Sequence, residues 1–296
     1  MDIDEIDFGT IRNLMQKNSL GRLIERFLRH SGAVHILHTM QMNRHMEKMN
    51  IGREKNEFAD FYERHKNQFE EVVYLLEDDL SKKTFRAVIN YHLTYNIKEI
   101  EPFIIYPQYF QKDILLPRQD YEAFVDGGAY TGDSGKEFLK IFNESAQYKV
   151  YLWEADPDNL AKLNKSFSNV PYCEIVPYAM WDCADTLSFN SSGTPAAAIN
   201  REGNYQVDAD SIDKIHAGQE ITFIKMDIEG AEIKALEGAK KTIVEQKPKL
   251  AISIYHKYEH LYQIPLMLKE MVPDYKLYIR HHSDTLSDTV VYATIK

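Results

Sequence analysis

One short segment constrains the fold of this chain more than any other, because it joins an apolar strand to a glycine-rich turn. The strand is Phe124–Asp126, and the turn after it contains Gly128 and Gly132 in the spacing D-x-G-x-x-x-G. Glycine lets the backbone turn tightly and approach a ligand where a Cβ atom would clash, and an acid at the end of the strand can accept hydrogen bonds. The segment therefore predicts the ligand loop of an open α/β sheet.

The spacing of this loop narrows the choice of ligand. It differs from the dinucleotide spacing G-x-G-x-x-G, and the chain lacks the phosphate-binding G-x-x-x-x-G-K-[ST]. S-adenosylmethionine has no pyrophosphate, but it needs an acid for its ribose hydroxyls. Glu154 ends the apolar run Val150–Trp153, 22 residues beyond Gly132, where such an acid is expected at the end of a second strand. The pattern predicts S-adenosylmethionine and disfavours a nicotinamide oxidoreductase.

A third segment supports the same reading and identifies a family. The strand-like run Thr222–Asp227 continues into Ile228-Glu229-Gly230-Ala231-Glu232 and then into apolar residues at helical spacing. Together the three segments resemble the FkbM family of S-adenosylmethionine-dependent O-methyltransferases, in which a strand running into an Asp-x-Glu-Gly-Ala-Glu turn is characteristic. The resemblance extends from about Leu75 to the end of the chain.

The resemblance implies a set of cofactor contacts. It assigns the glycine loop to the methionine moiety and Glu154 to the ribose. For the residues after the third strand it implies adenine contact, although core packing explains Met180 and Trp181 equally well. The predicted cofactor-binding set is Asp126, Gly127, Gly128, Gly132, Glu154, Ala179, Met180 and Asp227.

The order of apolar segments predicts an α/β fold. Strands are expected at 123–126, 150–154, 173–177, 222–227 and 250–256, with helical segments between them, which favours a doubly wound parallel sheet. Strands at 275–280 and 289–293 have no room for a helix between them and predict an antiparallel hairpin. Seven strands ending in a hairpin is the class I methyltransferase layout. The segments 186–190 and 205–207 are expected to add edge pairing.

The N-terminal part of the chain reads as helical. Apolar residues recur at helical spacing within 11–50, and further helices are expected from Glu57 and after Ser81. We predict a helical N-terminal region over residues 1–100 and a Rossmann-like methyltransferase domain over 101–296. The N-terminal helices are a candidate surface for homo-oligomer formation.

Charge and cysteine content exclude several classes of partner. The 296-residue chain has a formal net charge of −10, which argues against a nucleic-acid backbone or an anionic membrane as the main partner. Its two cysteines, Cys173 and Cys183, do not form a disulfide framework. Neither a signal peptide nor an apolar run long enough to span a membrane is found. We expect a cytoplasmic enzyme.

The carboxyl ends of the strands supply the candidate catalytic residues. Asp227, Glu229 and His256 would meet at this rim, and each is a candidate general base; His256 has an ordinary pKa near neutrality. Lys225 stands within a buried strand and needs a carboxylate partner, either Asp227 or another acid. Asp227 and Glu229 alone are too few ligands to predict a metal site.

Two other segments have less certain roles. The aromatic segment 102–119 is expected to pack the helices onto the sheet, with a lining role in the cleft as the alternative. The polar residues Arg280, His281 and His282 are expected to be exposed in a tight connection, with contact to an anionic or sugar substrate as the alternative.

The predicted function is S-adenosylmethionine-dependent O-methylation of a hydroxyl on a sugar, glycoconjugate or secondary metabolite. The alternative is a methyltransferase-shaped module without catalysis that recruits a partner through its N-terminal helices. The retained loop and acids favour the enzyme. The sequence does not determine the acceptor.

Overall fold

The computed structural model describes residues 51–115, 120–142, 147–189 and 205–295. The chain divides into two compact units, residues 1–57 and 58–296. The second unit contains every strand described below, whereas the helical stripe expected within 11–50 lies outside the described residues. The boundary expected at residue 100 stays a prediction.

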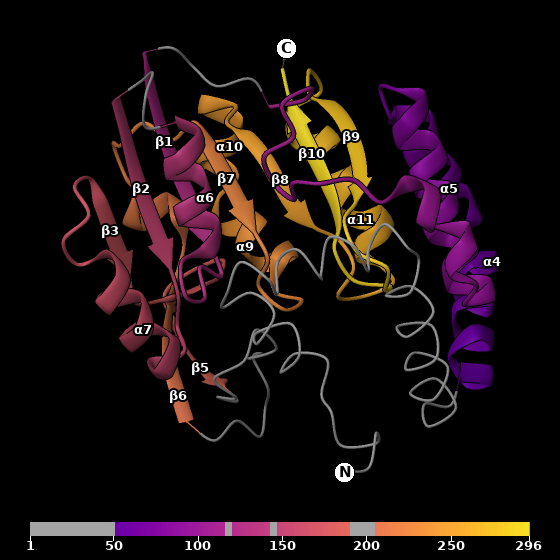
Figure 1. Ribbon diagram of the computed structural model, residues 1–296, viewed down its shortest axis with the longest axis horizontal. Coiled ribbons are helices and arrows are strands. Elements are labelled where there is room, and N and C mark those ends of the chain that lie inside the picture. The colour runs from indigo at the N-terminus through magenta and orange to yellow at the C-terminus, as the bar shows by residue number, and fades with distance from the viewer. Residues whose placement is uncertain (1–50, 116–119, 143–146, 190–204, 296) are drawn as a thin grey trace, which may run out of the picture. The chain divides into compact units, whose positions relative to one another are not determined.

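A seven-stranded sheet forms the centre of the second unit (Figure 1). Its order is β3-β2-β1-β7-β8-β10-β9, and all neighbours are parallel except those of β10, which runs antiparallel to both β8 and β9. The strands are β1 (Tyr121–Gly127), β2 (Gln147–Trp153), β3 (Cys173–Val176), β7 (Phe223–Met226), β8 (Lys249–Ser253), β9 (Lys276–His281) and β10 (Thr289–Thr294). The predicted fold class is therefore confirmed, including the final hairpin.

Helices cover both faces of the sheet. Successive side chains along a strand point to opposite faces, so each strand contributes apolar side chains to a core on either side. On one face Phe124 and Leu152 pack against Phe138 of α6 and Phe167 of α7. On the other face Val125 belongs to the core that also holds residues of α9, α10 and α11. The helices are α6 (Asp133–Phe142), α7 (Pro157–Phe167), α8 (Ile212–Ile215), α9 (Glu232–Gly238), α10 (Lys240–Gln246) and α11 (His260–Met271).

Two further helices precede the sheet in sequence: α4 (Ile51–Leu75) and α5 (Asp79–Thr94) are followed by the short 3-10 helices η2 (Ile97–Glu99) and η3 (Glu101–Phe103). The start of α5 is tied to the edge strand β9, since Ser81 Oγ accepts the backbone N–H of Ile279 at 3.0 Å. Beside it, the Arg280 guanidinium pairs with Asp78 at 2.7 Å and with Asp113 at 3.2 Å.

Two expectations from the sequence are wrong here. Arg280, His281 and His282 are buried, because the hairpin is covered by α5 and by the segment after η3. The expected extra pairing at 186–190 and 205–207 does not extend the main sheet. Instead β4 (Ala179–Met180), β6 (Tyr205–Asp210) and β5 (Asp185–Phe189) form a separate three-stranded sheet in the order β4-β6-β5.

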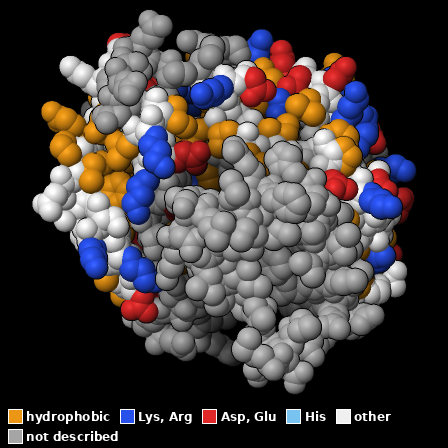
Figure 2. Space-filling model, viewed as in Figure 1, with side chains coloured by type: hydrophobic (Ala, Val, Ile, Leu, Met, Phe, Trp, Pro, Cys, Tyr) orange, Lys and Arg blue, Asp and Glu red, His pale blue; other side chains and the backbone are white. Residues whose placement is uncertain are grey.

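Cys173 and Cys183 are both free. Within the described ranges, no helix has the length and apolar character that a membrane span requires. On the face drawn in Figure 2, the basic and acidic side chains of the described residues are interspersed and form no continuous basic surface.

Candidate active site

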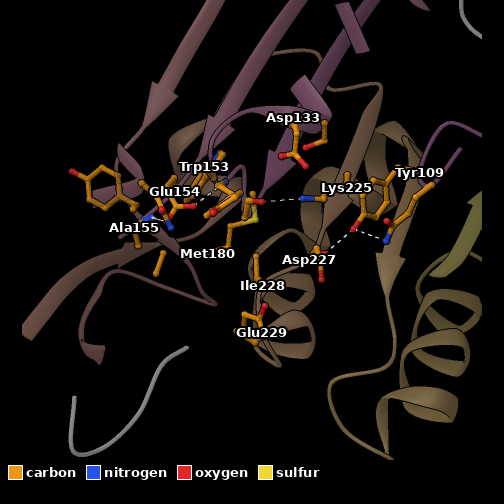
Figure 3. A pocket seen from close by; sticks show the side chains of 18 of the residues that line it. Tyr109, Asp133, Trp153, Glu154, Ala155, Met180, Lys225, Asp227, Ile228 and Glu229 are labelled. Carbon is orange, nitrogen blue, oxygen red and sulfur yellow. Dashed lines mark hydrogen bonds between the residues drawn. The ribbon is translucent and has the colours of Figure 1, made fainter. Parts of the chain in front are cut away.

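A cavity of about 260 Å³ opens at the carboxyl ends of β1, β2 and β7 (Figure 3). Ligands bind at this position in open α/β sheets, because the crossover loops diverge where the strand order reverses. The cavity is lined by Gln108, Tyr109, Gly128, Tyr130, Asp133, Ser134, Trp153, Glu154, Ala155, Asn159, Tyr178, Ala179, Met180, Lys225, Asp227, Ile228, Glu229, Ala231, Tyr255 and Asp288.

Glu154 lies at one end of this cavity, held by backbone amides. Its Oε1 accepts the N–H groups of Ala155 at 2.9 Å and Asp156 at 2.8 Å, and its Oε2 accepts that of Tyr130 at 2.9 Å. Burial raises the pKa of this carboxyl, while the amide hydrogen bonds act against that shift. A carboxylate has about four acceptor sites, so Oε2 retains one for a hydroxyl donor.

The residues around Glu154 form a largely apolar end of the cavity. Trp153, Ala155, Ala179 and Met180 line it, and Figure 3 shows Met180 between Glu154 and the centre of the site. Trp181 is not among the lining residues. This end of the cavity therefore places a carboxylate, which can accept hydrogen bonds from hydroxyl groups, beside apolar side chains.

The glycines of the first loop have different structural roles. Gly128 has φ +70° and lines the cavity, and a Cβ atom there would lie 2.0 Å from the carbonyl oxygen of Asp227. Gly132 has φ +80°, but its Cβ position faces Phe167 of α7 at 2.1 Å, so this glycine permits helix packing and does not line the cavity. At Gly127 an added Cβ would lie 2.6 Å from Met180 Sδ.

Asp126 and Lys225 form a buried pair beneath the cavity. Asp126 is fully buried, does not line the cavity, and is 3.0 Å from Lys225 Nζ through Oδ1; its Oδ2 accepts the hydroxyl of Ser134 at 2.6 Å. Lys225 Nζ also donates to the carbonyls of Gly127 and Gly128, each at 3.0 Å. The expected partner of Lys225 is therefore a carboxylate, but it is Asp126 and not Asp227.

Asp227 lies at the opposite end of the cavity from Glu154, between two tyrosines. Tyr109 donates its hydroxyl to Asp227 Oδ2 at 2.7 Å, and Tyr255 donates to Oδ1 at 3.1 Å. Burial together with the nearby Asp227 carboxylate raises the pKa of both phenols, so they stay protonated donors. The two tyrosines fix the orientation of Asp227.

Glu229, His256 and Glu232 form a chain of charged groups behind this end. His256 Nε2 is 3.5 Å from Asp227 Oδ1 and 3.4 Å from Glu229 Oε2, and His256 Nδ1 is 2.9 Å from Glu232 Oε1. Glu232 is fully buried, and its Oε2 is 3.2 Å from His260 Nδ1. Of the three predicted catalytic residues, Asp227 and Glu229 line the cavity, whereas His256 lies behind them.

The three members of this chain of charged groups differ in the direction of their pKa shifts. Burial, aided by repulsion from Asp227 and Glu232, raises the pKa of Glu229 to about 7 although His256 opposes the shift. Burial works against the charged form of His256, yet Glu232 and the other two carboxylates outweigh it and raise its pKa. Burial also opposes ionisation of Glu232, but the close contacts with His256 and His260 hold its pKa below the usual range.

We tested whether these groups fit a metal ion. Asp227, Glu232 and His256 could each present one ligand atom within 4.8 Å of the others. Glu232 Oε1 accepts the backbone N–H of Ile228 at 3.0 Å and lies 2.9 Å from His256 Nδ1. This oxygen therefore already has two contacts within the protein. The other oxygen, Oε2, has no hydrogen-bond partner among the described residues, so the three groups could still present ligand atoms; no step below uses a metal.

Among the lining residues that the sequence analysis did not select, four lie near Asp227 or beside its partners: Gln108, Tyr109, Tyr255 and Asp288. Gln108 and Tyr109 come from the aromatic segment before β1, for which a lining role was the less favoured alternative. Tyr109, Glu229 and Asp288, like Tyr130, have positive φ angles of 51° to 65°. Such strain in residues other than glycine is typical of functional sites.

Comparisons with known proteins agree with this geometry. Residues 126–284 match the Methyltransferase FkbM domain. The crystal structure of methyltransferase FkbM from Methylobacillus flagellatus KT is similar, with a TM-score of 0.68 and 29% sequence identity over 79% of this chain and 60% of that chain. This chain thus spans less than two thirds of that protein. No curated protein matches the sequence.

Two more distant structures are similar over part of this chain. Fibrillarin from Aeropyrum pernix, with natively bound S-adenosyl-L-methionine, has a TM-score of 0.40 and 8% identity over 61% of this chain and 70% of that one. Precorrin-6y C5,15-methyltransferase from Geobacter metallireducens GS-15 has a TM-score of 0.40 and 10% identity over 61% of this chain and 84% of that one.

The strand order and the position of the cavity define a class I methyltransferase fold. The domain match covers more than half of the sequence, from Asp126 to Asp284. The chain belongs to the FkbM methyltransferase family, and the family predicted from the sequence is confirmed.

Proposed function

We propose that this protein transfers the methyl group of S-adenosylmethionine to a hydroxyl of a sugar, glycoconjugate or secondary metabolite. The observation that carries the proposal is a single cavity with two unlike ends: Glu154 beside apolar walls at one, and Asp227 with Glu229 at the other. The first end suits a nucleoside, and the second suits a hydroxyl that must lose a proton.

The residues at the Glu154 end bind and orient the donor. Oε2 of Glu154 would accept hydrogen bonds from the ribose hydroxyls, Trp153 and Met180 would contact the base, and Gly128 would let the backbone approach the methionine part. Asp126 acts through Lys225: their pair holds the carbonyls of Gly127 and Gly128 and so shapes the loop. The bound donor supplies an electrophilic methyl group on a sulfonium.

The residues at the Asp227 end hold the acceptor and remove its proton. Asp227, fixed by Tyr109 and Tyr255, accepts a hydrogen bond from the acceptor and aligns it. We assign Glu229 as the general base, since a base is most effective when its pKa lies near the working pH, and burial brings this one to about 7. His256, with a raised pKa and a contact to Glu232, acts as a positioning cation behind Glu229.

A second candidate function is a methyltransferase-shaped binding module that recruits a partner through the N-terminal helices. A binding module does not need a carboxyl group with a pKa near 7, such as that of Glu229, facing the cavity. The positive φ angle of Glu229 also favours the enzyme. The two functions differ in one measurement, because only the enzyme converts S-adenosylmethionine to S-adenosylhomocysteine.

Calorimetric titration with S-adenosylmethionine, S-adenosylhomocysteine and NAD tests the donor site. We expect binding of the first two only. Glu154→Gln should weaken both by about one to two decades in Kd, because a charged acceptor contributes roughly 1.5–3 kcal/mol. The matched control is Glu174→Gln, an exposed glutamate on β3, which should bind like the parent. Unchanged affinity in a folded Glu154→Gln protein would remove Glu154 from the site.

A further inference from the structure

The acceptor end of the cavity depends on a short segment before β1, residues 105–109. This segment supplies Gln108 and Tyr109 to the lining, and Tyr109 Oη donates to Asp227 at 2.7 Å (Figure 3). Gln108 Nε2 donates to Tyr109 Oη at 2.9 Å. Residues 105–109 contain no helix or strand. Their conformation must therefore come from contacts with other parts of the chain.

The backbone of Tyr109 needs such a contact. It has a left-handed conformation, with φ +65°. That conformation is unfavourable for a residue with a Cβ atom and persists only where the surrounding structure enforces it. The backbone N–H of Tyr109 donates to Tyr292 Oη at 3.1 Å, and Tyr292 is fully buried on β10. The Tyr292 hydroxyl thus anchors the backbone of the residue whose own hydroxyl orients Asp227.

The Tyr292 hydroxyl is held in turn by His282, the first residue after β9. His282 Nδ1 is 2.6 Å from the carbonyl oxygen of Ile105, and Nε2 is 2.8 Å from Tyr292 Oη. A carbonyl oxygen can only accept, so Nδ1 carries a proton and donates it. Burial lowers the pKa of His282 to about 4, so the ring is neutral near pH 7 and Nε2 is an acceptor. Tyr292 therefore donates its hydroxyl proton to His282.

These hydrogen bonds form one buried chain in which every proton has a place. The Tyr109 N–H donates to Tyr292, and the Tyr292 hydroxyl donates to His282. His282 donates to Ile105, so the chain returns to the segment in which it began. The Ile105 N–H also donates to the His281 carbonyl at 3.0 Å. A fully paired buried network rigidifies the segment, and removal of one member leaves its neighbours without partners.

We propose that Tyr292 and His282 are positioning residues for the acceptor end of the cavity. Neither of them lines the cavity. They act through Tyr109, because they hold its backbone where its hydroxyl fixes Asp227. This inference rests on the proposed function, in which Asp227 aligns the acceptor.

Two matched substitutions separate positioning from simple stabilisation. Tyr292→Phe removes only the hydroxyl that joins His282 to Tyr109. The control is Tyr275→Phe, because Tyr275 is also fully buried and its hydroxyl donates to the Pro248 carbonyl at 2.6 Å. Pro248 immediately precedes β8, at the end of that strand opposite to the cavity. Each variant loses one buried phenol hydroxyl, but only Tyr292→Phe breaks the chain that leads to the cavity.

The first readout needs neither donor nor acceptor. NMR on the free protein, with tyrosine carbon-13 labelled at Cζ, reports the hydrogen bond of each phenol, and Tyr109→Phe identifies the resonance of Tyr109. We expect this resonance to move in Tyr292→Phe and to stay in place in Tyr275→Phe. His282→Asn keeps a donor for the Ile105 carbonyl but loses the acceptor for Tyr292. It should therefore move the same resonance, and it provides the test if Tyr292→Phe does not fold.

The second readout is the initial rate of S-adenosylhomocysteine formation. Displacement of Asp227 should lower this rate about tenfold in Tyr292→Phe, with the Kd of S-adenosylmethionine within about twofold of the parent, because the donor end is untouched. Tyr275→Phe should keep the parental rate. A Tyr109 resonance that stays in place, a parental rate in Tyr292→Phe, or an equal loss of rate in Tyr275→Phe would each overturn the proposal.

Failure of this inference can be told apart from failure of the proposed function. A parent protein that neither binds S-adenosylmethionine nor forms S-adenosylhomocysteine contradicts the proposed function. A parent protein that does both, while its rate and its Tyr109 resonance are insensitive to Tyr292→Phe and His282→Asn, contradicts only the positioning role.

Discussion

The two ends of the cavity are built by different means. At the donor end, Glu154 is fixed mainly by the amides of the two residues that follow it, within one strand-to-helix connection. At the acceptor end, Asp227 is fixed by Tyr109, which lies 118 residues away in sequence, and by Tyr255. The comparison teaches that the Glu154 end can be specified by a local motif, whereas the Asp227 end depends on segments that only the folded chain brings together.

The histidines behind the two ends also differ. His216 accepts the Trp153 indole N–H at 3.0 Å behind the donor end, and burial lowers its pKa to about 4. His256 behind the acceptor end has three carboxylates around it and a raised pKa. The donor end therefore needs a neutral histidine, and the acceptor end favours a charged one.

The largest effect is expected from Glu229→Gln. Loss of the general base should reduce turnover by about 10²–10⁴-fold while the Kd of S-adenosylmethionine stays within a few-fold. In the parent, turnover should rise with pH through about 7, because the base must be deprotonated. Initial rates of S-adenosylhomocysteine formation across pH give both results, with the exposed Glu270→Gln as control.

His256→Gln sharpens the same experiment. His256 lowers the pKa of Glu229, so its removal should move the midpoint of the rate profile to higher pH. A midpoint that stays in place would show that His256 does not act through Glu229. Full turnover in Glu229→Gln would transfer the role of base to Asp227 or His256.

The next largest effect concerns the loop that joins the two ends. Gly128→Ala should lower the free energy of unfolding by about 3 kcal/mol, since a Cβ atom would clash with the Asp227 carbonyl at a left-handed backbone position. Gly218 provides the matched control: it has φ +77°, but nothing lies within 4 Å of its Cβ position. Gly218→Ala should lose only about 1 kcal/mol in urea titrations. Equal losses would mean that backbone strain, and not the contact with Asp227, determines the requirement for glycine.

A smaller effect is expected from His216 in acid. Its folded-state pKa of about 4 lies below the ordinary value of 6.5, so its contribution to stability is full above pH 6.5 and is lost as pH falls toward 4. The loss should be about 3 kcal/mol, because His216 is buried and one pKa unit corresponds to about 1.4 kcal/mol. Unfolding free energies of the parent and of His216→Gln over this window should converge as pH falls. Parallel curves would show that His216 titrates normally, and that the two ends do not differ in this respect.

The smallest effect is expected from Tyr255→Phe. Removing one hydrogen bond to Asp227 should reduce the free energy of unfolding by about 1 kcal/mol and leave the Kd of S-adenosylmethionine unchanged, because the donor end does not depend on Tyr255. Thermal unfolding and calorimetry on the same sample test both statements. Weaker donor binding in this variant would show that the two ends are coupled.

The sequence by itself determined the sheet and the rim on which the acids lie, and it predicted the class of ligand. Strand positions follow from continuous apolar runs, and the glycine loop with Glu154 is a local pattern whose chemistry needs no distant partner. Asp227 and Glu229 were predicted because they end a strand, and the need of Lys225 for a carboxylate follows from its place within a buried strand.

Only the tertiary structure decided which carboxylate pairs with Lys225, that Gly132 serves helix packing, and that Tyr109 and Asp288 line the cavity. It also separated Glu229, which faces the cavity, from His256, which lies behind it against Glu232. The physical reason is that pairing, burial and pKa depend on distances between residues far apart along the chain. Apolar periodicity specifies the face on which a side chain lies, but it does not specify the side chain that lies opposite.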